Sequence, residues 1–177
     1  MSNLIRYLKS AYLLSLNREK QERIVWNRLK KYIDDSDIKH GVYEKERRIT
    51  AVFEISEGKA VKCHYFLFEN HLCNIMRFLD NYPTDFTTEL FILATHFNNL
   101  LNLGTVVINV NDRYVEYALK RELIIHALSE GAIADQISAH YAIANDIYYA
   151  FQRLVEENEA PAIIIADLLK KQEQQEN

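Results

Sequence analysis

The spacing of apolar residues changes near Ile49, and this change restricts which folds the chain can adopt. From Leu4 to Leu16 apolar side chains recur every three or four residues, and the same spacing returns from Ile24 to Ile33 after the polar run Asn17–Lys20. This period is typical of helices, whereas from Ile49 onward the period becomes two, which is typical of a strand. The chain therefore predicts two N-terminal helices, or one interrupted helix, followed by a sheet.

Three successive strands are predicted in the next segment. The first begins at Ile49 and ends at the turn Glu57–Lys59, and the segments Ala60–Phe68 and Leu72–Leu79 follow as two more. Because the connections are short, neighbouring strands pair as an antiparallel meander.

A helix with one apolar stripe is predicted after the meander. Thr84 and Asp85 are N-cap candidates, and Gly104 stands where a left-handed residue would end the helix. The stripe comprises Phe86, Leu90, Leu93, Ala94, Phe97, Leu100 and Leu101.

The last third predicts a hairpin and two helices. Thr105–Val110 and Arg113–Leu119 flank Asn111 and Asp112, which tolerate positive φ. The long helix that follows has an apolar stripe of Ile133, Ile137, Ala144, Tyr148, Phe151 and Val155. Pro161 opens a short helix through Leu169, and the polar residues 170–177 predict a frayed tail.

Together these elements predict an α+β fold, with a five-stranded antiparallel sheet flanked by helices and two extra N-terminal helices. Residues 1–177 are expected to form a single domain, with N-terminal helices in 1–40 and an α+β core in 48–157. No linker or internal repeat divides the chain.

Composition excludes several classes of partner. A net charge of −4 and a pI near 5.9 provide no basic field for nucleic acid. The apolar runs are far shorter than the roughly 20 residues of a membrane span, so no membrane partner is expected. The chain shows no signal peptide, and its two cysteines, Cys63 and Cys73, are too few for a disulfide framework, which predicts reduced thiols in the cytoplasm.

Two groups of residues contain the side-chain types that bind metal ions. Cys63, His64, His71 and Cys73 have suitable ligand types, but adjacent Cys63 and His64 point to opposite faces of a strand. Buried thiols and ordinary histidines therefore explain this group better than zinc.

A second group, Asp35, Asp37 and Glu46, partly matches a calcium-binding loop. Lys39 and His40 occupy positions where that loop requires an oxygen ligand and glycine. No metal or other cofactor is expected at either group.

No catalytic motif is present. There is no Gly-x-Ser-x-Gly elbow, and the four glycines stand singly, so no glycine-rich loop can cradle a phosphate. The chain is expected not to be an enzyme.

The strands carry apolar residues on both faces, which predicts that both faces need cover. Phe66 and Phe68 face away from Tyr65, and Ile75 and Met76 also lie on opposite faces. Either the N-terminal helices or a second subunit could cover the second face.

Three tyrosines on the long helix suit either an interface or the edge of the core. The candidate partner-binding or dimer surface therefore comprises Phe66, Phe68, Ile75, Met76, Tyr141, Tyr148 and Tyr149.

The segment Ile92–Gly104, followed by Thr105–Val110 and Tyr114–Leu119, resembles the YbjN-like family, whose members share the type III secretion chaperone-like fold. In that family a helix rich in Ala, Asn and Leu ends at Leu-Gly and is followed by a hairpin and a long helix. The resemblance covers about residues 48–157 and implies a bacterial protein that dimerises and acts as an adaptor or chaperone, with no catalytic residues. The two helices before Arg48 exceed the single leading helix expected from the family.

The leading hypothesis is thus a non-enzymatic module that dimerises and binds a partner protein through an apolar surface. The alternative is a small-molecule binding protein or a cryptic enzyme, with a pocket between sheet and helices near His64, Tyr65 and His96.

Overall fold

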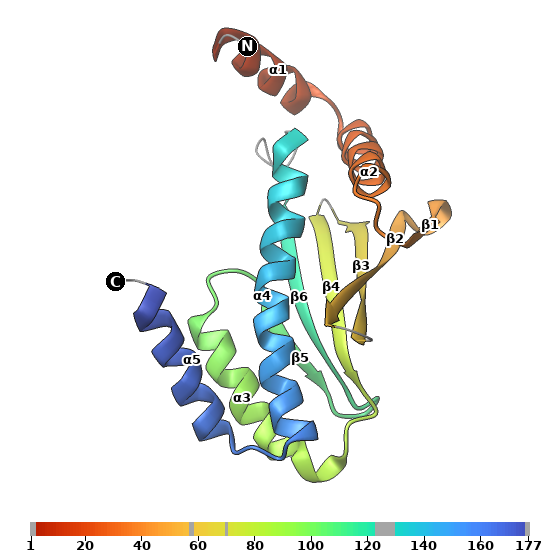
Figure 1. Cartoon of the computed structure of the whole chain (residues 1–177). Coiled ribbons are helices and arrows are strands. Elements are labelled where there is room, and N and C mark those ends of the chain that lie inside the picture. Colours follow the sequence, from red (N-terminus) through yellow and green to blue (C-terminus); the bar gives the residue numbers. More distant parts are fainter. Residues whose placement is uncertain (1–2, 57–58, 70, 123–129, 176–177) are drawn as a thin grey trace. The chain divides into compact units, whose positions relative to one another are not determined.

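Two helices form at the N-terminus because a polar residue interrupts the apolar periodicity. The computed structural model describes residues 3–56, 59–69, 71–122 and 130–175, and α1 (Asn3–Ser15) and α2 (Arg18–Asp35) are its first elements (Figure 1). Asn17 caps α2, since its side-chain oxygen accepts a hydrogen bond from the backbone N–H of Lys20. The prediction of two N-terminal helices is confirmed.

The described residues form one sheet of six strands in the order β1-β2-β3-β4-β6-β5. The strands are β1 (His40–Tyr43), β2 (Arg48–Ser56), β3 (Lys59–Phe68), β4 (His71–Asp80), β5 (Thr105–Asn109) and β6 (Tyr114–Glu122). β2, β3 and β4 are neighbours, and the pairs β1–β2, β2–β3 and β5–β6 are antiparallel. The α+β class and the helix-flanked antiparallel sheet are confirmed, with one strand more than predicted.

The additional strand, β1, has no apolar alternation of its own. It pairs with β2, so that His40 lies opposite Ala51 and Tyr43 lies opposite Arg48. A 3₁₀ turn at Glu44–Glu46 joins the two strands, and Arg47 adopts a left-handed conformation with φ of 45°. β1 is therefore defined by its pairing, which a pattern of single residues does not reveal.

The predicted caps of the central helix were wrong. Thr84 and Asp85 lie in a 3₁₀ turn (Thr84–Phe86). α3 (Thr87–Leu100) begins directly after this turn, and no side chain caps its N-terminus. The helix ends before Gly104, which has the predicted positive φ of 75° but lies in the connection to β5.

Two helices complete the chain, namely α4 (Glu130–Glu156) and α5 (Pro161–Gln175). Pro161 opens α5 as predicted, but the helix continues past Leu169 into the segment expected to fray. The hairpin turn also differs in detail, because the positive φ falls on Arg113 instead of on Asn111 or Asp112.

The chain divides into two compact units, each built from two segments. Unit 1 contains Met1–Ile75 and Leu119–Tyr141, and unit 2 contains Met76–Ala118 and Ala142–Asn177. The division passes through β4, β6 and α4. The single domain expected from the sequence stays a prediction.

In unit 1, the N-terminal part of α4 contacts one face of β2, β3 and β4. The ring of Tyr65 lies 6.5 Å from that of His140, and the ring of Phe53 lies 5.1 Å from that of Tyr141. Gln136, which is 2% exposed, donates a 2.9 Å hydrogen bond to the side chain of the fully buried Asn74. This buried polar pair fixes how α4 lies against β4.

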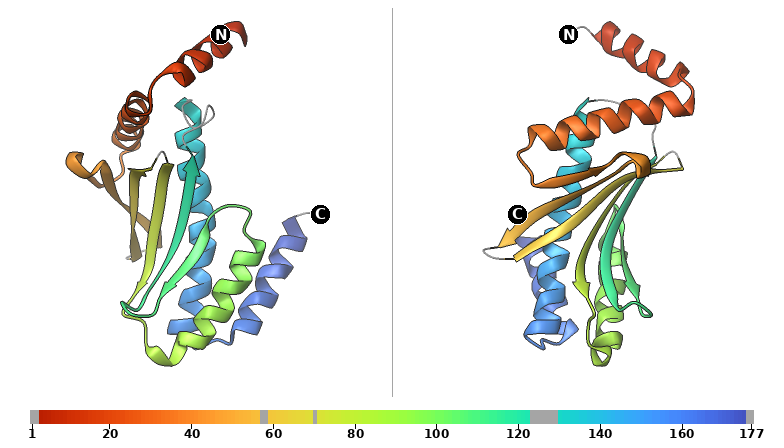
Figure 2. Two further views of the ribbon diagram at one scale, coloured as in Figure 1. Left: turned by 180° about the vertical axis from the view of Figure 1, so that it is seen from behind. Right: turned by 90° about the vertical axis from the view of Figure 1, so that its right-hand side faces the viewer.

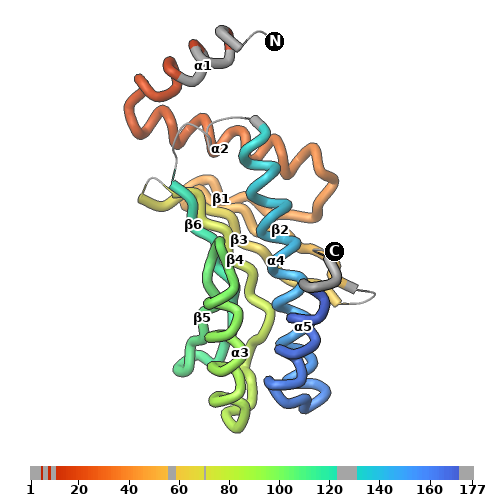
Figure 3. Tube along the Cα trace, turned by 90° about the vertical axis from the view of Figure 1, so that its left-hand side faces the viewer, coloured from red at the N-terminus to blue at the C-terminus, as the bar shows by residue number. Residues whose placement is uncertain are grey.

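α2 is joined to the turn between β1 and β2 by charged side chains. Glu44 accepts hydrogen bonds from the indole of Trp26 at 2.8 Å and from Lys30 at 2.7 Å, which lowers the pKa of its carboxyl, with the Lys30 bond as the larger cause. Arg47 donates to Glu22 at 2.6 Å. The path of α2 across the other elements of unit 1 is visible in Figure 3.

In unit 2, aromatic rings form the centre of the core. The ring of Phe151 in α4 lies 5.3 Å from that of Phe78 and 6.1 Å from that of Phe97. α3 and α5 lie side by side (Figure 2). Arg153 connects the end of α4 to α5, since it donates to Glu159 and to Asp167 at 2.9 and 2.8 Å.

Candidate partner-binding surface and apolar cavity

β2 and β3 in unit 1 have one buried face and one open face. The register places Ile49 opposite Tyr65, and both are fully buried. It also places Thr50 opposite His64, and these half-buried side chains are joined by a 3.0 Å hydrogen bond on the other face. Because side chains alternate along a strand, the residues that follow His64 at a spacing of two share its face.

Aromatic residues continue this second face. Phe66 is half-buried and Phe68 is 54% exposed. Ile75 in β4 is half-buried, whereas its neighbour Met76 points to the opposite face and is fully buried. We define the open face as Val52, His64, Phe66, Phe68 and Ile75. Its members are only partly covered, so this face is an apolar sheet surface of unit 1 that a partner could occupy.

The seven residues predicted as a partner-binding surface do not share one surface. Phe66, Phe68 and Ile75 belong to the open face, but Met76 is 0% exposed and Tyr148 is 5% exposed, so these two are core residues. Burial of Met76 and Tyr148 requires a correction to the predicted surface.

The other two tyrosines also differ from each other. Tyr141 packs on Phe53 and donates a hydrogen bond to the backbone oxygen of Glu54 at 3.1 Å. Tyr149 is 43% exposed, and its ring contacts the edge of the Tyr148 ring at 5.6 Å. Tyr149 belongs to unit 2, whereas the residues of the open face belong to unit 1.

Sequence reasoning missed exposed apolar residues on α3. Phe91 and Ile92 are 45% and 50% exposed, on the side of the helix away from its buried stripe. The signal was present, because α3 contains one charged residue, Glu89, and is apolar around most of its circumference. A helix with this composition usually has cover on more than one side.

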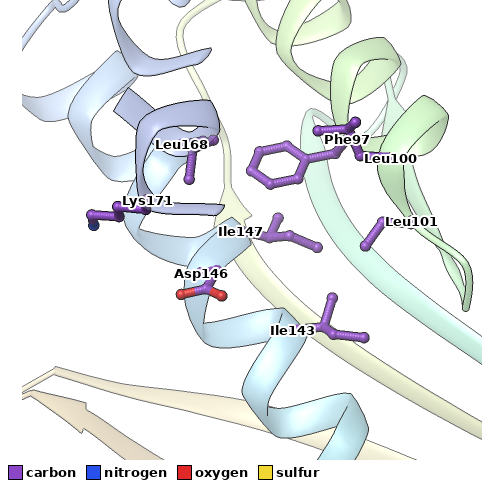
Figure 4. Close-up of a pocket in the computed structure, with 8 residues that line it drawn as sticks. All are labelled: Phe97, Leu100, Leu101, Ile143, Asp146, Ile147, Leu168 and Lys171. Atoms are coloured by element: carbon purple, nitrogen blue, oxygen red, sulfur yellow. The ribbon is translucent and has the colours of Figure 1, made fainter. Parts of the chain in front are cut away.

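A cavity of about 220 Å³ lies between α3, α4 and α5 in unit 2 (Figure 4). Six apolar side chains and two charged ones line it, namely Phe97, Leu100, Leu101, Ile143, Asp146, Ile147, Leu168 and Lys171. The apolar lining favours a small hydrophobic group, and the carboxylate and ammonium offer one polar contact of each sign.

A pocket was predicted between sheet and helices near His64, Tyr65 and His96, but the first two of these residues cannot line the same pocket. His64 and Tyr65 face opposite sides of β3, and the hydroxyl of Tyr65 is buried in unit 1. His96 belongs to unit 2, where it is half-buried on α3. The cavity of unit 2 thus involves other residues than those predicted.

Several residues of the two groups with metal-ligand side-chain types make other contacts. His71 donates a 2.7 Å hydrogen bond to the backbone oxygen of Glu69, while Cys63 is buried on the opposite face from His64. Asp35 pairs with Lys31, and Glu46 pairs with Arg48. Within the described part of the chain, no three His, Cys, Asp or Glu residues lie close enough to hold a metal ion.

Both cysteines are buried thiols. Desolvation raises the pKa of Cys63 to about 12 and also raises that of Cys73, so neither is an activated nucleophile. None of the described helices combines the length and the apolar content needed to cross a bilayer.

Comparison with known proteins gives matches by structure. No protein-family model matches the chain, and no curated protein matches its sequence. Among solved structures, YbjN from E. coli, a proposed transcription regulator, aligns with a TM-score of 0.56 and 8% identity over 73% of this chain and 93% of that chain. The ExsC–ExsE complex aligns with a TM-score of 0.53 and 13% identity over 76% of this chain and 95% of the matched chain.

At sequence identities of 8 and 13%, the structural similarity shows a shared fold and nothing more. The fold predicted from the segment Ile92–Gly104 and the following hairpin, that of YbjN and of secretion-chaperone-like proteins, is confirmed. By description, one neighbour is a proposed regulator and the other is a complex of two proteins.

Proposed function

We propose that the chain is a non-enzymatic protein-interaction module that binds a partner polypeptide through the open face of unit 1. The observation that carries this proposal is the partly uncovered aromatic row of β3, in which Phe68 is 54% exposed beside the half-buried Phe66. Large apolar side chains on a rigid sheet supply most of the binding energy in protein interfaces.

The comparisons support the proposal at the coarse level, because one matched structure is a complex of two proteins. No catalytic or cofactor chemistry is part of the proposal. The cytoplasmic location remains a prediction from the sequence.

Self-association is the second part of the proposal. The candidate surface is the exposed apolar set on unit 2, with Phe91 and Ile92 on α3 and Tyr149 on α4.

The test uses three single substitutions to aspartate at residues of similar exposure. Phe68→Asp alters the open face, Phe91→Asp alters α3, and Ile163→Asp, whose side chain is 52% exposed on α5, is the control. Partners are recovered with the wild-type protein, identified, produced separately and titrated against each variant. The solution mass of each variant is measured by light scattering over a concentration series.

We expect Phe68→Asp to weaken partner binding at least about tenfold, because loss of one hot-spot aromatic residue commonly costs about 2 kcal/mol or more of binding free energy. The solution mass should stay unchanged. Phe91→Asp should lower the mass from dimer to monomer. Equal partner affinity for Phe68→Asp and Ile163→Asp would contradict the assignment of the open face. A wild-type monomer at all concentrations would contradict self-association.

A second candidate function, binding of a small apolar molecule, is favoured by the cavity of unit 2. Its lining is mainly aliphatic and aromatic, and its volume of about 220 Å³ suits a small ligand. Substituting Ile143, which is half-buried at the cavity wall, with Trp should fill the space and abolish ligand-induced thermal stabilisation. A screen in which no compound raises the melting temperature of the wild type would remove this candidate.

A further inference from the structure

The helix α1 exposes an apolar face that its own unit does not cover. The described side chains Ile5, Leu8 and Tyr12 are 53%, 57% and 63% exposed, and their spacing of three and four residues places them on one side of the helix. Leu14 is also 44% exposed. α1 extends from the start of α2 and lies apart from the strands of unit 1 in every view of Figures 1 to 3.

The attachment of α1 to α2 uses another side of the helix. Leu13 is 8% exposed, and its backbone oxygen accepts a hydrogen bond from the side chain of Gln21 at 3.1 Å. Positions 5, 8 and 12 cluster on the helical wheel, whereas position 13 is rotated about 100° from position 12. The anchoring contact therefore leaves the apolar face unoccupied.

The charge of this region differs from that of the remaining chain. The first 17 residues, which precede α2 and include α1, contain two basic residues, Arg6 and Lys9, and no aspartate or glutamate, while the other residues contain 19 basic and 25 acidic ones. An exposed apolar face on a basic, acid-free segment is the pattern of helices that lie in the interface of an anionic bilayer.

The apolar face of α1 is too small to form a stable protein interface by itself. A helix of 13 residues is about 20 Å long and about 10 Å wide. One face of it covers a few hundred Å², on the order of half or less of the roughly 800 Å² per partner that a stable protein interface buries. A lipid surface has no such threshold, because the binding strength grows with the buried apolar area and with each basic residue.

We propose that α1 is a peripheral membrane-binding helix that inserts Ile5, Leu8 and Tyr12 into the surface of an anionic lipid bilayer. The helix lies in the interface and does not cross it, in keeping with its length of 13 residues. The acidic remainder of the chain is screened beyond about 8 Å at physiological salt, so the local charge of the first residues governs the contact.

The experiment is flotation of the full-length protein with vesicles of phosphatidylcholine alone or mixed with phosphatidylglycerol. We expect the wild type to float with the anionic vesicles at least about tenfold better than with the neutral ones, and high salt to reverse this binding. Leu8→Asp/Tyr12→Asp should abolish flotation. Arg6→Glu/Lys9→Glu should reduce it to the level seen with neutral vesicles.

The control is Ile163→Asp, an aspartate introduced on α5 at a similarly exposed residue, which should float like the wild type. Far-UV circular dichroism checks that all variants remain folded. Absence of wild-type flotation at low salt, or equal flotation of Leu8→Asp/Tyr12→Asp, would overturn the proposal. If the wild type does not float and Leu8→Asp/Tyr12→Asp lowers the solution mass, the face binds a second copy of the chain and the lipid assignment is wrong.

Discussion

Asn98 forms two hydrogen bonds with the backbone of Val106. Its side-chain nitrogen donates to the carbonyl oxygen of Val106 at 3.0 Å, and its oxygen accepts from the N–H of the same residue at 2.7 Å. β5 is an edge strand of the sheet, so the backbone groups of Val106 that point away from β6 have no neighbouring strand to pair with. The amide of Asn98 replaces the missing partner and joins α3 to the edge of the sheet.

Replacement of Asn98 by Ala should therefore destabilise the fold by about 1 to 2 kcal/mol, because both groups of the buried Val106 lose their partner. Asn99→Ala, an exposed neighbour on the same helix, is the control and should change stability by less than about 0.5 kcal/mol. Urea unfolding measures both. Equal stabilities of the two variants would show that the Asn98 amide contributes nothing to the edge.

Gly104→Ala should be strongly destabilising. The residue has a φ of 75°, and an added Cβ would lie 2.5 Å from the hydroxyl of Tyr117, which donates a hydrogen bond to Leu103. Positive φ and overpacking together are expected to cost about 2 kcal/mol or more.

Gly131→Ala is the matched control, and it is expected to change stability in the opposite direction from Gly104→Ala. Among the described residues, the nearest atom that a Cβ there would meet belongs to the Asp135 carboxylate, at 4.0 Å. Because Gly131 lies in α4, Gly131→Ala should stabilise the protein by about 0.5 to 1 kcal/mol. Thermal unfolding of both variants tests the pair. A Gly104→Ala variant as stable as the wild type would contradict the close approach of Tyr117.

The ion pair between Arg153 and Asp167 should make stability depend on pH in the acid range. Arg153 donates a hydrogen bond to Asp167, and this lowers the pKa of that carboxyl below its usual 3.8. Because the pKa of Asp167 is lower in the folded protein than in the unfolded chain, its carboxylate contributes stability at pH values above the unfolded-state pKa. This contribution is lost as the pH falls through the folded-state pKa.

Arg153→Leu should therefore lower stability at neutral pH only modestly, since the carboxylate of Asp167 is exposed, and should make the acid limb of the stability curve shallower. Urea midpoints measured from neutral pH downward test this. An acid limb of unchanged slope in Arg153→Leu would refute the assignment.

Alkaline conditions should destabilise the protein through two buried groups. Burial raises the pKa of Cys63 from 9.0 to about 12 and that of Tyr117 from 10.0 to about 12. The stability that these neutral groups contribute is fully present below their pKa values in the unfolded chain, and it is lost as the pH rises through their pKa values in the folded protein. Between the two pKa values of a group, only the unfolded chain ionises. Cys63→Ala should remove the part of this loss that begins near 9.0, as measured by urea unfolding above neutral pH.

Met76 and Phe68 separate the core from the open face. Met76→Asp places a carboxylate at a fully buried position and should cost more than about 3 kcal/mol. Phe68→Asp, at a residue that is 54% exposed, should cost about 1 kcal/mol or less. Circular dichroism melting curves compare them, and similar losses of stability would contradict the orientation of β3 or β4.

Most elements were predictable because their own residues encode them. The interruption at Asn17 and the period of two after Ile49 both locate real boundaries. The same is true of the apolar stripe of α3, in which Leu90, Leu93 and Phe97 are buried. These signals are local, and tertiary contacts reinforce them.

What the sequence did not reveal depends on distant residues. β1 exists because it pairs with β2, and Gly104 is required by the approach of Tyr117 rather than by the end of α3. The candidate surface was only partly predicted, because alternation along β4 does not indicate which of Ile75 and Met76 faces the helix. Assigning Tyr148 to the core required knowing the side from which α4 is covered.

The two segments of unit 1 also determine the order in which a newly made chain can fold. Ile49 and Tyr65 leave the ribosome well before residues 130–141, although His140 in that later segment packs against Tyr65. The part of the inner face of β2 and β3 that α4 covers is therefore bare until residues 130–141 have been made, a stage at which unprotected strands are prone to aggregate. A nascent chain of this topology depends on rapid elongation, or on a bound chaperone, until α4 has been translated.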